Sequence, residues 1–217
     1  MELAIIRHAL PVRVDEGTVE GPADPPLAPL GRAQAEALAT WLATERIHAV
    51  WSSPTRRARE TAAPMAERLG LEVQVDERLA EYDRHATSYI PLEELKAAGA
   101  PRWNQVPERP EEFQAHVVAA MEDIAAAHPG QRVAVVCHGG AVNAYVAHVL
   151  GLADPIFFLP GYTSISRVLA ASSGQRSVST LNETAHLRGV GWAGARRGAG
   201  PPEPAPRELP PNSSSCL

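Results

Sequence analysis

Two histidines in this sequence each follow a short apolar run, a position from which a side chain can do chemistry. His8 comes directly after Arg7 and the run 3–6, and His138 follows the run 133–136. In an open α/β sheet, ligands bind beyond the carboxyl ends of the strands. An imidazole there can act as a nucleophile, an acid or a base near neutral pH. A single histidine that ends a strand is more often structural, so neither residue is strong evidence alone.

A pair of arginines adds a second kind of chemistry at the same edge. Residues 49–51 form another apolar run, followed by Ser53 and Pro54, which are typical of a helix start. Arg56 and Arg57 then fall in the first helical turn, where the helix dipole disfavours cations. A solvated helix face is the usual explanation of such a pair. A bound anion would resolve the unfavourable placement of Arg57, because helix N-termini attract anions.

The hydrophobic pattern predicts the elements that would bring these residues together. Because short apolar runs alternate with segments of helical period, we expect an α/β fold with a mostly parallel central sheet and helices on both faces. Ser53 is expected to cap the second helix, and Pro64 predicts a kink or an early stop in it. Strands are expected at 3–6, 49–51, 71–75, 133–136, 164–171 and 176–181, and helices at 31–45, 53–69, 111–127 and 141–150.

One domain and a tail account for the rest of the 217 residues. Residues 1–188 are predicted to form the domain, and 189–217, rich in glycine and proline, a disordered tail. Residues 76–110 lack periodicity apart from one helical turn around 92–98. A long irregular insertion in a compact domain is typical of a binding lid, so this segment is expected to form the wall that determines specificity.

Composition excludes several classes of protein. The formal net charge of −5 argues against a general nucleic-acid binder, which needs a basic surface. Two cysteines exclude a disulfide scaffold, and the eight histidines lack metal-ligand spacing, so no metal site is expected. Neither a signal peptide nor an apolar stretch of bilayer length is visible. We therefore predict a cytoplasmic protein without a membrane partner.

Taken together, the motifs resemble the histidine phosphatase superfamily, the phosphoglycerate-mutase-like group. Their order and spacing both fit, and the resemblance covers roughly residues 1–188. It implies the α/β fold already expected from periodicity. The matching segments are LAIIRHA at 3–9, LGRAQA at 30–35, SSPTRRARETA at 52–62, LAE at 79–81 and VVCHGG at 135–140.

The resemblance also implies a role for each matched residue. His8 becomes the nucleophile that is phosphorylated, and Arg7, Arg57 and His138 become the phosphate-binding groups. The family's proton donor falls on Glu81. Planar, permanently charged guanidinium groups suit the oxygens of a phosphoryl group in transfer, so neither metal nor cofactor is implied.

Departures from the family pattern leave alternatives open. Alanine stands at Ala9 where the family usually has glycine, which would cost about 1 kcal/mol if that position needed a positive φ. Asp83 is a rival to Glu81 as proton donor. Arg13 and Gly139 are candidate substrate-binding residues, with a solvated loop position as the alternative for Arg13.

These observations predict a metal-independent phosphomonoester hydrolase of the histidine acid phosphatase type. It would act on a small phosphorylated metabolite through a phosphohistidine. Phosphoglycerate mutase activity is the first alternative, but residues 10–13 lack the segment that mutases carry after the histidine. A non-catalytic phosphate-binding or interaction module is the second. The natural substrate and the oligomeric state are not indicated by the sequence.

Overall fold

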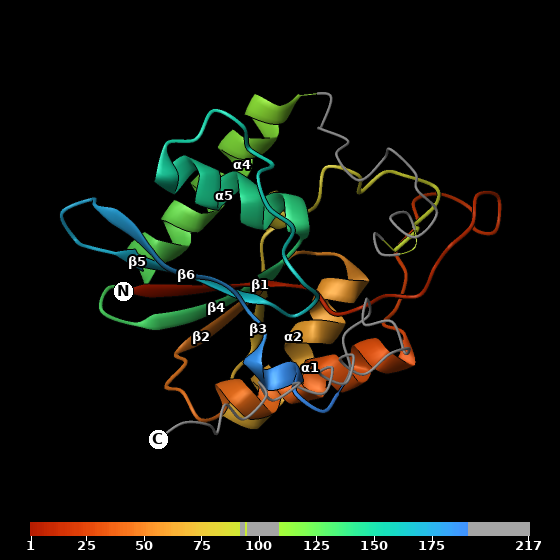
Figure 1. The fold of residues 1–217 in the computed structure, drawn as a ribbon, viewed down its shortest axis with the longest axis horizontal. Coiled ribbons are helices and arrows are strands. Elements are labelled where there is room, and N and C mark those ends of the chain that lie inside the picture. Colours follow the sequence, from red (N-terminus) through yellow and green to blue (C-terminus); the bar gives the residue numbers. More distant parts are fainter. Residues whose placement is uncertain (92–93, 95–108, 191–217) are drawn as a thin grey trace, which may run out of the picture.

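A six-stranded sheet lies between two pairs of helices (Figure 1). The computed structural model describes residues 1–91, 94 and 109–190. The strands are β1 (Glu2–Arg7), β2 (Ala49–Ser52), β3 (Val73–Val75), β4 (Arg132–Cys137), β5 (Ile165–Ala170) and β6 (Arg176–Glu183). The helices are α1 (Pro29–Leu42), α2 (Arg56–Leu69), α4 (Pro110–Ala127) and α5 (Gly139–Leu150), with short 3-10 turns η1 (Glu77–Leu79) and η3 (Ala185–Leu187).

The order of the strands places β1 and β4 at the centre of the sheet. It runs β3-β2-β4-β1-β5-β6, and the first four strands are parallel. The strand β5 runs antiparallel to both of its neighbours. The predicted mostly parallel sheet is therefore confirmed. The carboxyl ends of β1, β2 and β4 meet at one edge, as the sequence analysis required.

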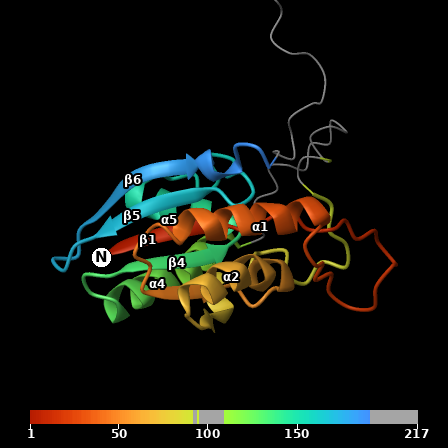
Figure 2. The ribbon, with the colours of Figure 1, turned by 90° about the horizontal axis from the view of Figure 1, so that it is seen from below.

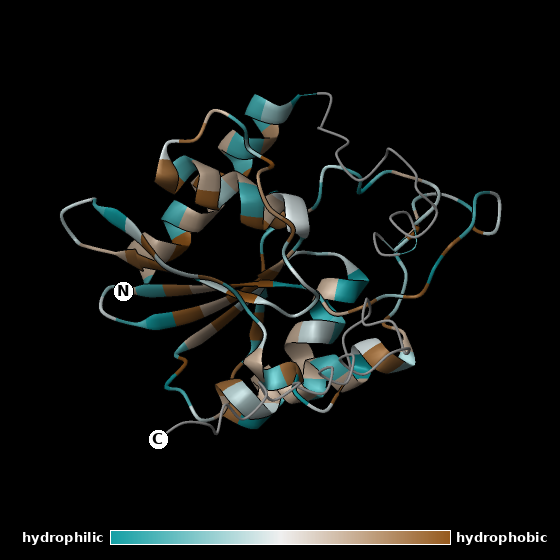
Figure 3. Cartoon of the chain, in the orientation of Figure 1, coloured by the Kyte–Doolittle hydropathy of each residue, from teal (hydrophilic) through white to brown (hydrophobic). Residues whose placement is uncertain are grey.

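Each face of the sheet is covered by one pair of helices, α4 and α5 on one face and α1 and α2 on the other (Figures 1 and 2). Successive residues of β1 point to opposite cores. Leu3 and Ile5 belong to the cluster under α4 and α5, whereas Ala4 and Ile6 belong to the cluster under α1 and α2. Because both faces are buried, the residues between Glu2 and Arg7 are all apolar, and the apolar colour in Figure 3 runs through the middle of the sheet.

Two details of α2 differ from the prediction. Thr55, not Ser53, is the N-cap residue, since the Ser53 hydroxyl is engaged elsewhere with His138. The helix also continues through Pro64 to Leu69, so an early stop was wrong. Met65 and Ala66 are buried against the sheet directly after the proline. This packing offsets the cost of a proline inside a helix, which is about 3 kcal/mol for the lost hydrogen bond and the ring clash together.

Two predictions lie outside the described residues. The helical turn expected around 92–98 falls there apart from Glu94, and so does nearly all of the predicted tail, 191–217. Among the described helices, none combines the length and the apolar character that crossing a bilayer requires.

Candidate active site

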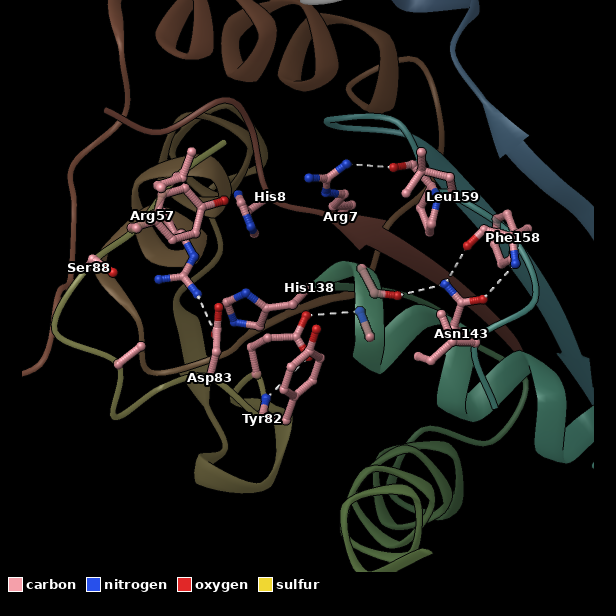
Figure 4. A pocket seen from close by; sticks show the side chains of 18 residues that line it. Arg7, His8, Arg57, Tyr82, Asp83, Ser88, His138, Asn143, Phe158 and Leu159 are labelled. Atoms are coloured by element: carbon pink, nitrogen blue, oxygen red, sulfur yellow. Dashed lines mark hydrogen bonds and ion pairs between the residues drawn. The ribbon is translucent and has the colours of Figure 1, made fainter. Parts of the chain in front are cut away.

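His8 lies at the carboxyl end of β1, almost fully buried in the wall of a pocket (Figure 4). Its Nδ1 is 2.8 Å from the carbonyl oxygen of Ala9. Because a carbonyl only accepts hydrogen bonds, Nδ1 carries the proton and Nε2 keeps its lone pair. Burial and the nearby charges of Arg57 and Arg7 hold the pKa of His8 well below its ordinary value of 6.5. The ring is thus neutral and held in one tautomer, as a nucleophilic histidine requires.

Two buried arginines flank this nucleophile, and each is packed on a tyrosine ring. Arg7 donates from Nη1 to the carbonyl oxygen of Pro160 at 2.7 Å, and its guanidinium carbon is 3.9 Å from the centre of the Tyr162 ring. Arg57, in the first turn of α2, lies 4.9 Å from the ring centre of Tyr89. Its Nε is buried without a hydrogen-bond partner among the described residues. Such a donor is suited to the equatorial oxygens of a phosphoryl group.

His138 caps α5 and faces His8, with ring centroids 5.1 Å apart. Its Nε2 is 2.7 Å from Oγ of Ser53, while its buried Nδ1 has no partner within the described chain. When the Ser53 hydroxyl donates to Nε2, Nδ1 carries the proton and can donate to an anion. Burial, Arg57, His8 and Arg7 lower the pKa of His138 well below its ordinary value. Before an anion binds, His138 is therefore neutral rather than the third positive charge that its protonated form would supply.

Glu81 is held at the start of α5. One carboxylate oxygen accepts the N–H of Gly140 at 2.9 Å, and the other accepts the N–H of Tyr82 at 3.2 Å. Burial and the neighbouring Asp83 raise the pKa of Glu81 to about 7, against the opposing effect of those two N–H groups. A carboxyl group with this pKa can donate a proton near neutral pH and take one back.

Asp83, the rival proton donor, lines the same pocket in a different role. Its Oδ1 is 3.7 Å from Nη2 of Arg57, and Figure 4 shows the two side chains facing each other. Burial raises the pKa of Asp83, whereas Arg57 lowers it. Asp83 is thus a counterion of a phosphate-binding arginine, and Glu81 is the carboxyl group placed on a helix N-terminus.

Three residues that the sequence analysis did not assign hold the site in shape. Thr61 accepts the N–H of Ala9 at 2.9 Å and donates to the carbonyl of Arg57 at 2.7 Å, so it joins two catalytic segments. Asn143 bonds the backbone of Phe158 in both directions, which fixes the segment that carries Pro160. A polar residue in the apolar run of α5 was the available signal for Asn143.

Thr163 is the third of these residues, and its φ of 55° lies in the left-handed region. That conformation is costly for a β-branched side chain. It directs the N–H of Thr163 to the carbonyl of Arg7 at 3.0 Å, next to the nucleophile. No pattern in the sequence indicated it, because the contact joins β1 to the turn before β5, two segments distant in the chain.

The remaining site predictions have mixed outcomes. Gly139 lines the pocket, but Gly140 is the glycine that the site needs, since a Cβ there would overlap the Glu81 carboxylate. Arg13 lies outside the pocket in exposed ion pairs with Asp15 and Glu94, so its expected substrate contact is not seen. Ala9 is absent from the described non-glycine residues with positive φ, so it carries no such strain.

The pocket enclosed by these residues has a volume of about 270 Å³. It contains Arg7, His8, Arg57, Glu81 and His138, all five residues that the family resemblance had matched. Within the described ranges, no group of three or more His, Cys, Asp or Glu side chains is arranged to hold a metal ion. Guanidinium groups, histidines and one protonated carboxyl group therefore make up the chemistry that the described chain offers to an anionic ligand.

Comparison with known proteins agrees with this geometry. The family model of the histidine phosphatase superfamily (branch 1) matches residues 3–184. Phosphoserine phosphatase 1 of Hydrogenobacter thermophilus is 30% identical over 200 residues, which cover 86% of this chain and 94% of that protein. Putative phosphoserine phosphatase 2 of the same organism is 33% identical over 161 residues, covering 69% of this chain and 79% of that protein.

A solved structure shares the fold. The native mycobacterial glucosyl-3-phosphoglycerate phosphatase superposes with a TM-score of 0.65 at 24% identity, over 84% of this chain and 99% of that one. Fold and site thus define a phosphoryl-transfer protein with a histidine at its centre. The chain belongs to the histidine phosphatase superfamily, branch 1.

Proposed function

We propose that this protein is a phosphomonoester hydrolase that works through a phosphohistidine at His8 and needs no metal ion. One observation carries the proposal: the neutral His8 ring, with its Nδ1 proton bonded to Ala9, lies in one pocket with Arg7, Arg57 and Glu81. The named relatives support the reaction class, since they are phosphatases of phosphoserine and of glucosyl-3-phosphoglycerate.

In the first step, the guanidinium groups of Arg7 and Arg57 bind the equatorial oxygens of the substrate phosphate. Nε2 of His8 attacks phosphorus as the bond to the ester oxygen breaks, and protonated Glu81 gives its proton to the departing alcohol. The product is a phosphohistidine that still carries the Nδ1 proton. His138 adds a further N–H donor to the phosphoryl group, which compensates the charge that builds up in transfer.

In the second step, a water molecule attacks the phosphohistidine. Glu81, now ionised, accepts the proton of that water while the bond between phosphorus and Nε2 breaks. Inorganic phosphate leaves, and both His8 and Glu81 return to their starting protonation states. The pKa of about 7 suits Glu81 to both directions of proton transfer.

Hydrolysis of p-nitrophenyl phosphate in EDTA tests the proposal, with His8→Ala beside the parent enzyme. We expect turnover in EDTA by the parent and none above background by the variant, together with acid-labile, base-stable phosphate trapped on the parent only. His116→Ala is the matched control, since His116 is exposed on α4 away from the pocket. Activity that EDTA abolishes, or a fully active His8→Ala, would contradict the mechanism.

Radiolabelled phosphoglycerate separates hydrolysis from mutase activity. We expect the label in inorganic phosphate, because Arg13 is held in ion pairs with Asp15 and Glu94 and does not line the pocket, where it could retain a phosphoglycerate for retransfer. Label recovered in an isomer of the substrate would favour the mutase instead.

A further inference from the structure

The charges in the pocket do not balance when a phosphate dianion alone is bound. Arg7 and Arg57 contribute two positive charges, and both histidines are neutral because their pKa values are lowered. A phosphate dianion neutralises the two arginines. Asp83, which is the counterion of Arg57 at 3.7 Å in the free protein, then loses the cation that it faces.

Asp83 is placed so that a ligand can reach it. Its side chain is 41% exposed although the facing Arg57 side chain is only 3% exposed, so the carboxylate lies at the open side of the phosphate site. A turn fixes its backbone, because the N–H of Ala86 donates to the carbonyl of Asp83 at 2.8 Å. The carboxylate therefore lies on a backbone held in a turn, in the same pocket as Glu81 and close enough to it for the two carboxyl groups to interact.

The surroundings of Asp83 supply no second cation within the described part of the pocket. Beyond the phosphate-binding groups and the carboxyl groups of Glu81 and Asp83, the described lining of the pocket is uncharged. The ring of Tyr89 already faces the guanidinium of Arg57, and the ring of Tyr82 packs edge-on against Phe113. A carboxylate with no second cation beside it favours a positively charged group on the substrate.

We propose that Asp83 selects substrates whose alcohol carries an ammonium group close to the ester oxygen, that is, phosphate monoesters of amino alcohols. This inference rests on the proposed phosphatase function and adds its substrate class. The ammonium group pairs with Asp83 when the phosphate displaces that carboxylate from Arg57. An alcohol that carries a carboxylate in the same place meets Asp83 as a like charge and is disfavoured.

A series of three small substrates of similar size tests the proposal at pH 8, where an accessible carboxyl group is ionised. The series comprises 2-aminoethyl phosphate, 2-hydroxyethyl phosphate and phosphoglycolate, which place a cation, a neutral group and an anion at the same end. We expect kcat/KM to fall about tenfold at each step of this order, the size of one partly screened ion-pair interaction. Equal values, or a preference for phosphoglycolate, would overturn the proposal.

The variant Asp83→Asn assigns the preference to this residue. We expect the ratio of kcat/KM between 2-aminoethyl phosphate and phosphoglycolate to fall at least tenfold in the variant, whatever happens to either rate alone. Asp123→Asn is the matched control, since Asp123 is exposed and pairs with Arg78 on the other side of η1. A variant that keeps the parent ratio would show that Asp83 is not the selecting residue.

Failure of the proposed function looks different. If the parent enzyme hydrolyses p-nitrophenyl phosphate but treats the three substrates alike, only the substrate class is wrong. If it neither hydrolyses p-nitrophenyl phosphate nor forms a phosphohistidine, the phosphatase function and the inference that rests on it both fall.

Discussion

The two ends of the central strands use arginine in opposite ways. Near the start of β1, Arg132 and Arg167 are held by carboxylates on all sides, namely Glu2, Glu45 and Glu183. At the other end, Arg7 bonds a backbone carbonyl, and the ion pair of Arg57 with Asp83 is a long contact of 3.7 Å.

This contrast separates an arginine that stabilises the fold from one that binds a ligand. Arg167 makes ion pairs of 2.7 Å with two carboxylates and of 3.1 Å with a third, so its charge is compensated before any ligand arrives. The guanidinium of Arg57 is more deeply buried, with 3% of the side chain exposed against 12% for Arg167, and yet it lacks a close anion within the described chain. A phosphate is the anion that we propose for this position. Removing either type of arginine should therefore affect different properties.

Replacing Arg57 by glutamine should have the largest effect, and it should fall on catalysis. We expect kcat/KM for p-nitrophenyl phosphate to drop by about 10²–10³, the usual cost of losing one preorganised donor to transition-state charge. Urea unfolding should show no loss of stability, because the ion pair removed is weak. Arg56→Gln changes the exposed neighbour on the same turn and should leave kcat/KM unaltered. Comparable losses in both variants would contradict the distinction.

Replacing Arg167 by glutamine should have the reverse profile. Its removal leaves Glu183 without its cation and leaves Glu2 and Glu45 with Arg132 alone, which we expect to lower the free energy of unfolding by about 3 kcal/mol. The kcat of the folded variant should match the parent. Urea denaturation measures the first quantity and initial rates the second. Arg68→Gln breaks a single exposed ion pair and should cost less than about 1 kcal/mol. A stable but inactive Arg167→Gln would show that the two ends are coupled.

Gly140 offers a smaller and more selective perturbation of the catalytic end. A methyl group in Gly140→Ala would overlap the Glu81 carboxylate and displace it from the helix N-terminus. We expect kcat for an alkyl phosphate, a poor leaving group, to fall about 100-fold, while p-nitrophenyl phosphate is much less affected. In Gly139→Ala the added carbon would lie 3.8 Å from Arg7, an ordinary contact, so this variant is the control. Equal losses on both substrates would argue against displacement of a proton donor.

The smallest expected effect is a pH dependence that belongs to Glu81. Its pKa of about 7 means that kcat/KM for an alkyl phosphate should fall about tenfold per pH unit above pH 7, as the donor loses its proton. The variant Glu81→Gln should hydrolyse the alkyl phosphate slowly, and its kcat/KM should lack this decrease above pH 7. Asp123→Asn should keep it. A parent profile that stays flat to pH 9 would exclude Glu81 as the acid.

The same pKa has a consequence for stability. A carboxyl group whose pKa is higher in the folded protein than its ordinary 4.5 destabilises the fold as pH rises between these values. The parent should therefore lose stability relative to Glu81→Gln as the pH rises from 5 to 8. The difference between their free energies of unfolding should change by about 1–3 kcal/mol in favour of the variant. A difference that is constant with pH would contradict the raised pKa.

Local patterns predicted the parts of the molecule that depend on near neighbours in sequence. The strands β1 and β4 are buried on both faces. Burial on both faces requires a continuous apolar run, and such a run can be recognised in the sequence. His8 and His138 could be assigned because each directly follows such a strand. The start of α2 was misplaced because Ser53 bonds His138, a partner 85 residues away.

Local sequence patterns could not predict the contacts between segments that are distant in the sequence. The sequence left Arg13 open between a substrate contact and a solvated loop position, and only the structure shows Glu94 beside it. The need for glycine at position 140 becomes visible only when Glu81 is packed against it. In its left-handed conformation, Thr163 donates its N–H to the carbonyl of Arg7, a residue far away in the sequence. These are properties of tertiary structure, and no periodicity encodes them.

The pairing of β1 with two distant strands also affects how the chain folds during its synthesis. The strand Glu2–Arg7 is translated before both of its partners, Arg132–Cys137 and Ile165–Ala170. Its apolar residues Leu3–Ile6 therefore stay unpaired in the nascent chain until those distant segments have been made, which favours slow folding and exposes a segment that chaperones bind. The surroundings of His8 are completed only when segments far along the chain have folded around it.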